Sequence, residues 1–157
     1  MIKETLLVLF LSSSLFSFDK YDKKALDFLQ IFKEASIMYE VDLKLLLAVS
    51  KAESHFDPKA ENKNKDGSID RGLMQINEWW RKELSKYTDG DVLQGLYEPE
   101  YNIKVGAWIL KQCINSYGES WKAVDCYNKG AKKAQDNSTY VQVVWKNYQS
   151  IPPELLK

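Results

Sequence analysis

The chain has 157 residues, its 22 Lys plus Arg balance 22 Asp plus Glu, and 13% of its residues are aromatic. The even charge excludes a basic field that would hold nucleic acid or an anionic membrane surface. With His55 as the single histidine and only two cysteines, the chain has no ligand cluster for a metal ion, so neither a metal nor a cofactor is expected.

The first residues predict a secretory signal peptide. Lys3 precedes an apolar stretch over residues 6–11, and residues 12–17 include several small serines. This apolar stretch is too short to span a bilayer as a helix. We therefore expect a signal peptide over residues 1–17, cleaved after Ser17, with an uncleaved anchor as the alternative. One compact domain over residues 18–157, located in the periplasm, would follow.

The rest of the chain predicts an almost wholly helical domain of about six helices. Apolar residues recur with helical spacing between Asp22 and Glu40, and Asp42 suits the N-cap of a second helix over residues 43–53. Pro58 and the polar residues up to 67 predict a long loop. The other helices are expected over residues 78–86, 99–117, 121–127 and from 137 or 138 to 148.

The two cysteines lie near the ends of two neighbouring predicted helices. Cys113 is late in the helix that ends at Gly118, and Cys126 is late in the next. Antiparallel helices would bring them together, and an exported chain meets an oxidising compartment. We expect a disulfide, which would fix the backbone that presents Tyr127 and Asn128.

Glu53 is the strongest candidate for chemistry. Leu45, Leu46 and Val49 lie eight, seven and four residues before it, so all share its helical face. Loss of hydration beside an apolar stripe raises the pKa of a carboxyl group, as a general acid near neutral pH requires. The alternative is a glutamate that turns its carboxylate to solvent.

Four short motifs together indicate a family. They are Glu53-Ser54, Gly72-Leu73-Met74-Gln75, Tyr127-Asn128 and a late Tyr140. Their order and separation resemble the soluble lytic transglycosylase superfamily over residues 28–148, which implies a mainly α, goose-type lysozyme-like single domain. The short chain and residues 66–70 resemble the small members that accompany envelope-spanning secretion and pilus systems.

The resemblance implies a peptidoglycan lytic transglycosylase that works with one glutamate. Glu53 would protonate the oxygen between N-acetylmuramic acid and N-acetylglucosamine. Its carboxylate would then take the proton of the muramyl C6 hydroxyl, and a 1,6-anhydro sugar would form. The implied partners are peptidoglycan glycan strands and components of secretion or pilus machinery, and the implied state is a monomer.

The same resemblance assigns supporting roles. Ser54 would order the turn after Glu53 or touch the sugar, and Gln75 would hydrogen-bond the sugar or the glutamate. Met74 is expected in the floor of a groove, with Tyr127 and Asn128 in its opposite wall. Tyr140 would reach in from the last helix. The family has Ala before Tyr-Asn, whereas this chain has Cys126, which the disulfide explains.

Other interpretations stay open. A hydrolytic muramidase would use a second carboxylate, from Asp57, Asp66 or Asp70. A non-catalytic glycan-binding module is a further alternative. Residues 62–70 resemble part of a calcium loop, but Leu73 stands where a bidentate Glu is required, so Asp66-Gly67 is interpreted as a turn. The sequence does not decide whether Trp79 and Trp80 belong to a groove rim or to the core.

Overall fold

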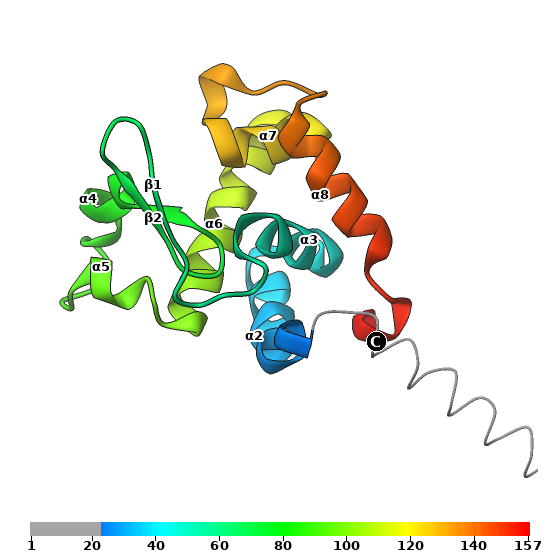
Figure 1. Cartoon of the computed structure of the whole chain (residues 1–157), viewed down its shortest axis with the longest axis horizontal. Helices are drawn as coiled ribbons and strands as arrows, with labels where there is room; N and C mark the ends of the chain where they lie inside the picture. Colours follow the sequence, from blue (N-terminus) through cyan, green and yellow to red (C-terminus); the bar gives the residue numbers. More distant parts are fainter. Residues whose placement is uncertain (1–22) are drawn as a thin grey trace, which may run out of the picture.

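The computed structural model describes residues 23–157, and the predicted signal peptide lies outside this range. The described elements are mostly helices (Figure 1), which confirms the mainly α class. In chain order they are α2 (Lys23–Tyr39), α3 (Leu43–Ser54), β1 (Glu61–Lys63), β2 (Ile69–Arg71), β3 (Ile76–Asn77), the 3-10 helix η1 (Glu78–Trp80), α4 (Arg81–Leu84), α5 (Val92–Gly95), α6 (Pro99–Tyr117), α7 (Trp121–Lys129), η2 (Ala131–Lys133), α8 (Thr139–Ser150) and η3 (Pro153–Leu156).

Helix α3 lies at the centre of the fold. It packs against α8 and α2, while α6 packs against α2 and α7 (Figure 1). The inward face of α3 carries Leu46, Leu47 and Val49, all fully buried. Phe32 of α2 and Phe56 pack edge to face, with ring centroids 6.2 Å apart. The centre of the core therefore holds the helix that ends in Glu53.

Side-chain caps set the helix boundaries that the sequence predicts. Asp42 accepts a hydrogen bond from the Leu45 N–H at 2.6 Å, and Ser120 and Ser138 cap α7 and α8 in the same way. Each cap satisfies an N–H that has no partner within its own helix. Gly118, at a φ of 69°, ends α6. The predicted order α2, α3, α6, α7 and α8 is confirmed.

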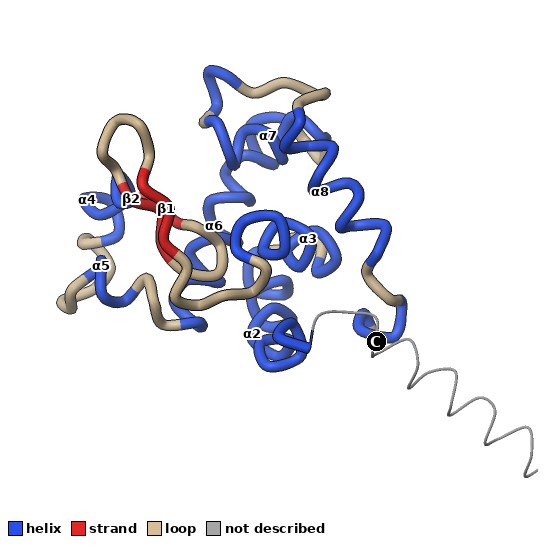
Figure 2. Tube along the Cα trace, viewed as in Figure 1, coloured by secondary structure: helices blue, strands red, loops and turns tan. Residues whose placement is uncertain are grey.

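The region between α3 and α6 differs from the prediction. Residues 61–63, expected in a long loop, form β1 of a three-stranded antiparallel sheet in the order β1-β2-β3, in which Asp70 pairs with Asn62 and Asn77 (Figure 2). The prediction of a single helix over residues 78–86 is also wrong. Asn77 caps the short helix η1, and α4 covers only Arg81–Leu84. Helices α5, η2 and η3 were not predicted.

The structure separates the two neighbouring tryptophans. Trp80 is partly buried and packs edge to face on Trp108, with ring centroids 5.3 Å apart. Trp79 is 78% exposed. Trp80 therefore belongs to the core and Trp79 to the surface. Within residues 23–157, no helix has the length and apolar character needed to cross a bilayer.

Candidate active site

Glu53 lies in the last turn of α3, with its side chain partly buried. Of the predicted apolar stripe on the same face, Leu46 and Val49 are fully buried and Leu45 is partly buried. Burial is the main cause that raises the pKa of Glu53 from 4.5 to about 7. A hydrogen bond from Tyr140 opposes this rise and the charge of Asp70 adds to it. At neutral pH the group therefore populates both its acid and its base form.

Tyr140 makes direct contact with Glu53. Its hydroxyl donates to the Glu53 Oε1 atom at 2.5 Å, which joins α8 to α3 across 87 residues of sequence. Burial, followed by the nearby charge of Glu53, holds the pKa of both Tyr140 and Tyr127 well above its usual value. Both phenols therefore stay protonated and act as donors at neutral pH.

The turn that carries Leu73 and Met74 is clamped by side chains from three helices. Ser50 and Ser54 of α3 both donate to the Leu73 carbonyl, at 3.0 and 2.8 Å. The side-chain amide oxygen of Asn102 accepts from the Met74 N–H at 2.7 Å. The Tyr127 hydroxyl donates to the Met74 carbonyl, also at 2.7 Å. This turn is thereby fixed beside the end of α3.

Sequence reasoning missed two members of this clamp. Ser50 is fully buried and Asn102 is 1% exposed. Asn102 also donates to the carbonyls of Arg71 and Leu96. The sequence signal for each was a polar residue among the apolar residues of a helix. Such a residue indicates a buried hydrogen bond, because buried polar groups need partners.

Two glycines let the backbone and Met74 pack closely. At Gly72, with a φ of 75°, an added Cβ atom would lie 2.4 Å from the Leu96 carbonyl oxygen and from the Asn102 amide nitrogen. At Gly106, an added Cβ atom would lie 2.7 Å from the Met74 side chain. Met74 is fully buried, so its side chain lies beneath the surface.

The remaining predicted site residues, Gln75, Ser54 and Asn128, differ in their contacts and in their exposure. The Gln75 amide nitrogen donates to the carbonyls of Ala60 and Gly72, so both its N–H groups are directed to the backbone and not to Glu53. Ser54 accepts from the Asp57 N–H at 3.2 Å, which orders the turn after the helix. Asn128 is exposed at the end of α7.

The three aspartates after Glu53 have different surroundings. Asp66 accepts from the Ser68 N–H and hydroxyl within the hairpin turn. Asp57 accepts from the Lys59 N–H. The carboxylate of Asp70 accepts from three amides, those of Asn62, Asn64 and Asn77.

The charge of Asp70 also raises the pKa of Glu53 and of Tyr127. Of these three aspartates, Asp70, in strand β2, is the one whose charge raises the pKa of Glu53. In the described part of the chain, no three His, Cys, Asp or Glu side chains form a group that could hold a metal ion.

Cys113 and Cys126 form the expected disulfide. Their Cα atoms are 5.8 Å apart, and the bridge links α6 to α7. Both residues are buried. Because Tyr127 follows Cys126 directly, the bridge restrains the backbone next to the tyrosine that holds Met74.

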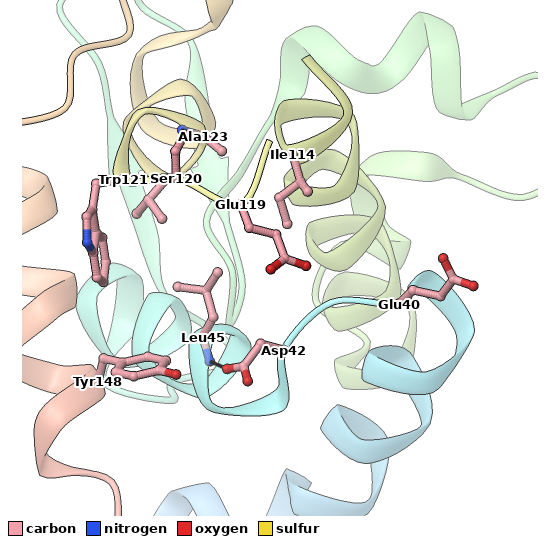
Figure 3. A pocket seen from close by; sticks show the side chains of 10 residues that line it. Glu40, Asp42, Leu45, Ile114, Glu119, Ser120, Trp121, Ala123 and Tyr148 are labelled. Carbon is pink, nitrogen blue, oxygen red and sulfur yellow. Dashed lines mark hydrogen bonds between the residues drawn. The ribbon is translucent and has the colours of Figure 1, made fainter. Parts of the chain in front are cut away.

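A cavity of about 460 Å³ lies at the opposite end of α3 from Glu53 (Figure 3). Its walls include Asp42 before the first turn of α3, Glu119 between α6 and α7, and the rings of Trp121 and Tyr148. None of the predicted site residues lines it. The cavity is therefore separate from the candidate active site.

The chain belongs to the transglycosylase SLT domain family, whose sequence model matches residues 30–149. Membership confirms the predicted class of enzyme, a peptidoglycan lytic transglycosylase.

Proteins of similar sequence and a solved structure of similar fold are consistent with membership of this family. Invasion protein IagB of Salmonella typhimurium (strain SL1344) is 38% identical over 120 residues, 75% of this chain and 74% of that protein. Protein IpgF of Shigella flexneri is 31% identical over 123 residues, 77% of this chain and 80% of that protein. The lytic transglycosylase Slt of Pseudomonas aeruginosa, solved as an inactive mutant, has a similar fold, with a TM-score of 0.58 at 21% identity. That likeness covers 81% of this chain and 21% of the Slt chain.

Proposed function

We propose that the protein cleaves the β-1,4 bond between N-acetylmuramic acid and N-acetylglucosamine in peptidoglycan, with Glu53 as the only acid and base. The carrying observation is the pKa of Glu53, which burial raises to about 7. A residue that first gives and then takes a proton works best when both of its forms are accessible at the working pH.

The proposed reaction returns Glu53 to its starting state. The protonated carboxyl gives its proton to the glycosidic oxygen as the bond from that oxygen to C1 breaks. The resulting carboxylate accepts the proton of the muramyl C6 hydroxyl, and the C6 oxygen bonds to C1. The products are a free N-acetylglucosamine hydroxyl and a 1,6-anhydromuramic end, and no water is consumed.

The neighbouring groups support each step. The Tyr140 hydroxyl, 2.5 Å from Glu53 Oε1, orients the carboxyl group and stabilises its ionised form. The negative charge of Asp70 favours the protonated form with which the reaction starts. Opposing effects of this kind keep the proton transferable in both directions.

A second candidate function is hydrolysis of the same bond. The observation that favours it is the placement of Asp70, whose charge raises the pKa of Glu53 and whose carboxylate accepts hydrogen bonds from the amides of Asn64 and Asn77. A muramidase would use such a group to stabilise the sugar cation or to activate water. The products differ, because hydrolysis leaves a reducing muramic end. A non-catalytic glycan-binding module would have no use for a carboxyl with a pKa near 7.

We further infer that the enzyme acts in the periplasm and opens the cell wall locally for an envelope-spanning machine. The support is the similarity to a protein that bears the name invasion protein and a disulfide, which persists in oxidising compartments.

The direct test is digestion of purified sacculi by the wild type and by Glu53→Gln. The amide has nearly the shape of the acid but no transferable acidic proton, so we expect release of soluble muropeptides to stop. Circular dichroism and the melting temperature would show that the variant is folded. Clearance at a rate close to that of the wild type would refute the assignment of Glu53.

A further inference from the structure

A buried carboxylate outside the candidate site links α7, which carries Tyr127, to the start of α8, which carries Tyr140. Asp125 of α7 is fully buried. One of its oxygens accepts from the Ser138 hydroxyl, and the other accepts from the Gln135 N–H at 2.8 Å and from Lys129 Nζ at 3.1 Å. A buried carboxylate is stable in the charged form only with such partners.

The charge of Asp125 is retained in the folded protein. Burial acts to raise its pKa, but the hydrogen bonds from Ser138, Gln135 and Lys129 hold the pKa of Asp125 below its usual value. Asp125 is therefore an anion at neutral pH, and its charge also contributes to the raised pKa of Tyr140.

Its contacts fix the start of α8. Ser138 is the N-cap of that helix and accepts from the Val141 N–H at 3.2 Å. Tyr140 is the second residue of α8. The direction in which its hydroxyl points follows from the orientation of this first turn. The connection between the helices is held a second time by the Tyr117 hydroxyl, which donates to the Ala131 carbonyl at 2.6 Å.

We propose that Asp125 is a positioning residue for the reaction at Glu53. By holding Gln135 and Ser138, it sets the first turn of α8 and so keeps the Tyr140 hydroxyl on the Glu53 carboxyl. Asp125 does not touch the reacting atoms, and it acts through Tyr140. This inference rests on the proposed role of Glu53 as acid and base.

The pH dependence of activity gives a readout that loss of stability alone would not move. Glu53 is faced by Tyr140 of α8, Tyr127 of α7 and Asp70 of β2. The Tyr140 hydrogen bond lowers the pKa of Glu53, so its loss raises that pKa further. The alkaline limb of the activity profile, where Glu53 loses the proton it must donate, then moves to higher pH.

The experiment is a double-mutant cycle of Asp125→Asn and Tyr140→Phe, measured on sacculi as kcat and KM across pH. In the wild type, hydrogen-bond donors face both oxygens of the Asp125 carboxylate. In Asp125→Asn, an N–H₂ group replaces one of these oxygens and cannot accept from them. We expect Asp125→Asn to lower kcat by about tenfold, the scale of one hydrogen bond to a charged group, with little change in KM. Its alkaline limb should move up as that of Tyr140→Phe does. The double variant should be no slower than Tyr140→Phe alone.

A matched pair of caps separates positioning from stability. Ser138→Ala removes the cap of α8 together with the Asp125 contact, and Ser120→Ala removes the cap of α7. Both should lower the melting temperature by a similar amount, but only Ser138→Ala should shift the alkaline limb. Ser138→Thr, which keeps the hydroxyl, should restore the wild-type profile. If Asp125→Asn does not fold, this pair carries the test.

The proposal would be overturned if the rate losses of Asp125→Asn and Tyr140→Phe multiplied in the double variant. It would also be overturned if the alkaline limb stayed in place in Asp125→Asn and Ser138→Ala. Failure of the proposed function is a separate result. In that case the wild type would release no anhydromuropeptides, or Glu53→Gln would be as active as the wild type.

Discussion

At the scale of the residue, the site depends on a carboxyl group whose protonation is balanced by its neighbours. Burial at the end of α3 makes the largest contribution to the raised pKa of Glu53. The Tyr140 hydrogen bond lowers this pKa, and the charge of Asp70 raises it further. Each contribution comes from a different element, so each can be removed separately. The predictions at this scale concern the pH at which each effect is seen.

The Glu53→Gln variant should be more stable than the wild type at alkaline pH. The pKa of Glu53 is about 7 in the folded protein and near 4.5 when unfolded, so the folded state binds more protons between these values. Wild-type stability therefore falls as pH rises from about 4.5 to 7, by at most about 3 kcal/mol. Glutamine carries no charge and avoids this loss. Denaturant unfolding at pH 8 and pH 4.5 checks the prediction, and a stability difference independent of pH would contradict it.

Asp70→Asn should shift activity toward lower pH while the product stays the same. Because the charge of Asp70 raises the pKa of Glu53, its removal lowers that pKa, and the alkaline limb moves down. We expect substantial activity to remain at the new optimum. Asp66→Asn is the matched control, since Asp66 bonds to Ser68 in the exposed hairpin turn. Loss as complete as that of Glu53→Gln would favour the two-carboxylate muramidase.

At the scale of the element, the Gly72–Gln75 turn is held from outside by helices. Side chains of Ser54, Asn102 and Tyr127 bond to its backbone, and each comes from a different helix. The turn thus depends on close approach as well as on hydrogen bonds. Two glycines of the same region separate these contributions.

Gly72→Ala should destabilise the protein much more than Gly67→Ala. Both residues have a positive φ, 75° and 87°, so each substitution meets a backbone cost of about 1–2 kcal/mol. At Gly67 an added Cβ atom meets nothing within 4 Å, whereas at Gly72 it lies 2.4 Å from the Leu96 carbonyl oxygen. We expect the Gly72 variant to lose about 1–3 kcal/mol more, as overpacking does. Thermal melts measure both, and equal losses would show that the packing is not tight.

Reduction of the disulfide should lower both stability and activity. The bridge closes a short loop between α6 and α7, with a separation of 13 residues, and contributes about 3 kcal/mol in the loop-entropy model. Activity should fall before global unfolding, because Tyr127 follows Cys126. Replacement of both cysteines by alanine should reproduce both effects. The oxidised protein should show no free thiol when denatured, and two titratable thiols would contradict the bridge.

At the scale of the whole molecule, the site joins parts of the chain that are distant in sequence. Glu53 ends α3, Tyr127 comes from α7 and Tyr140 from α8, while Asp70 lies in the sheet. Their common support is the packing of α3 against α8 and of α6 against α7. We therefore expect a change in this packing to affect the proposed chemistry through the positions of Tyr127 and Tyr140.

The main helices, and the position of Glu53 at the end of one of them, could be predicted from the sequence for local reasons. The apolar spacing before Glu53 and the caps Asp42, Ser120 and Ser138 are short-range signals. The sheet could not be predicted, because β1 is three exposed polar residues without alternation, and its support comes from side chains that meet at Asp70. The same holds for the Asn102 clamp and the Asp125 contacts, which link residues that only the folded chain brings together.

Digestion of sacculi in water enriched in oxygen-18, followed by mass spectrometry of the muropeptides, separates the two reactions by their products. If Glu53 works alone and the C6 hydroxyl attacks C1, the new muramic ends are anhydro sugars that carry no heavy oxygen. A hydrolase that uses Asp70 as its second carboxylate would instead leave reducing ends with one oxygen-18 atom each. We expect the unlabelled anhydro product from the wild type and no product from Glu53→Gln. Labelled reducing ends as the main product would contradict it.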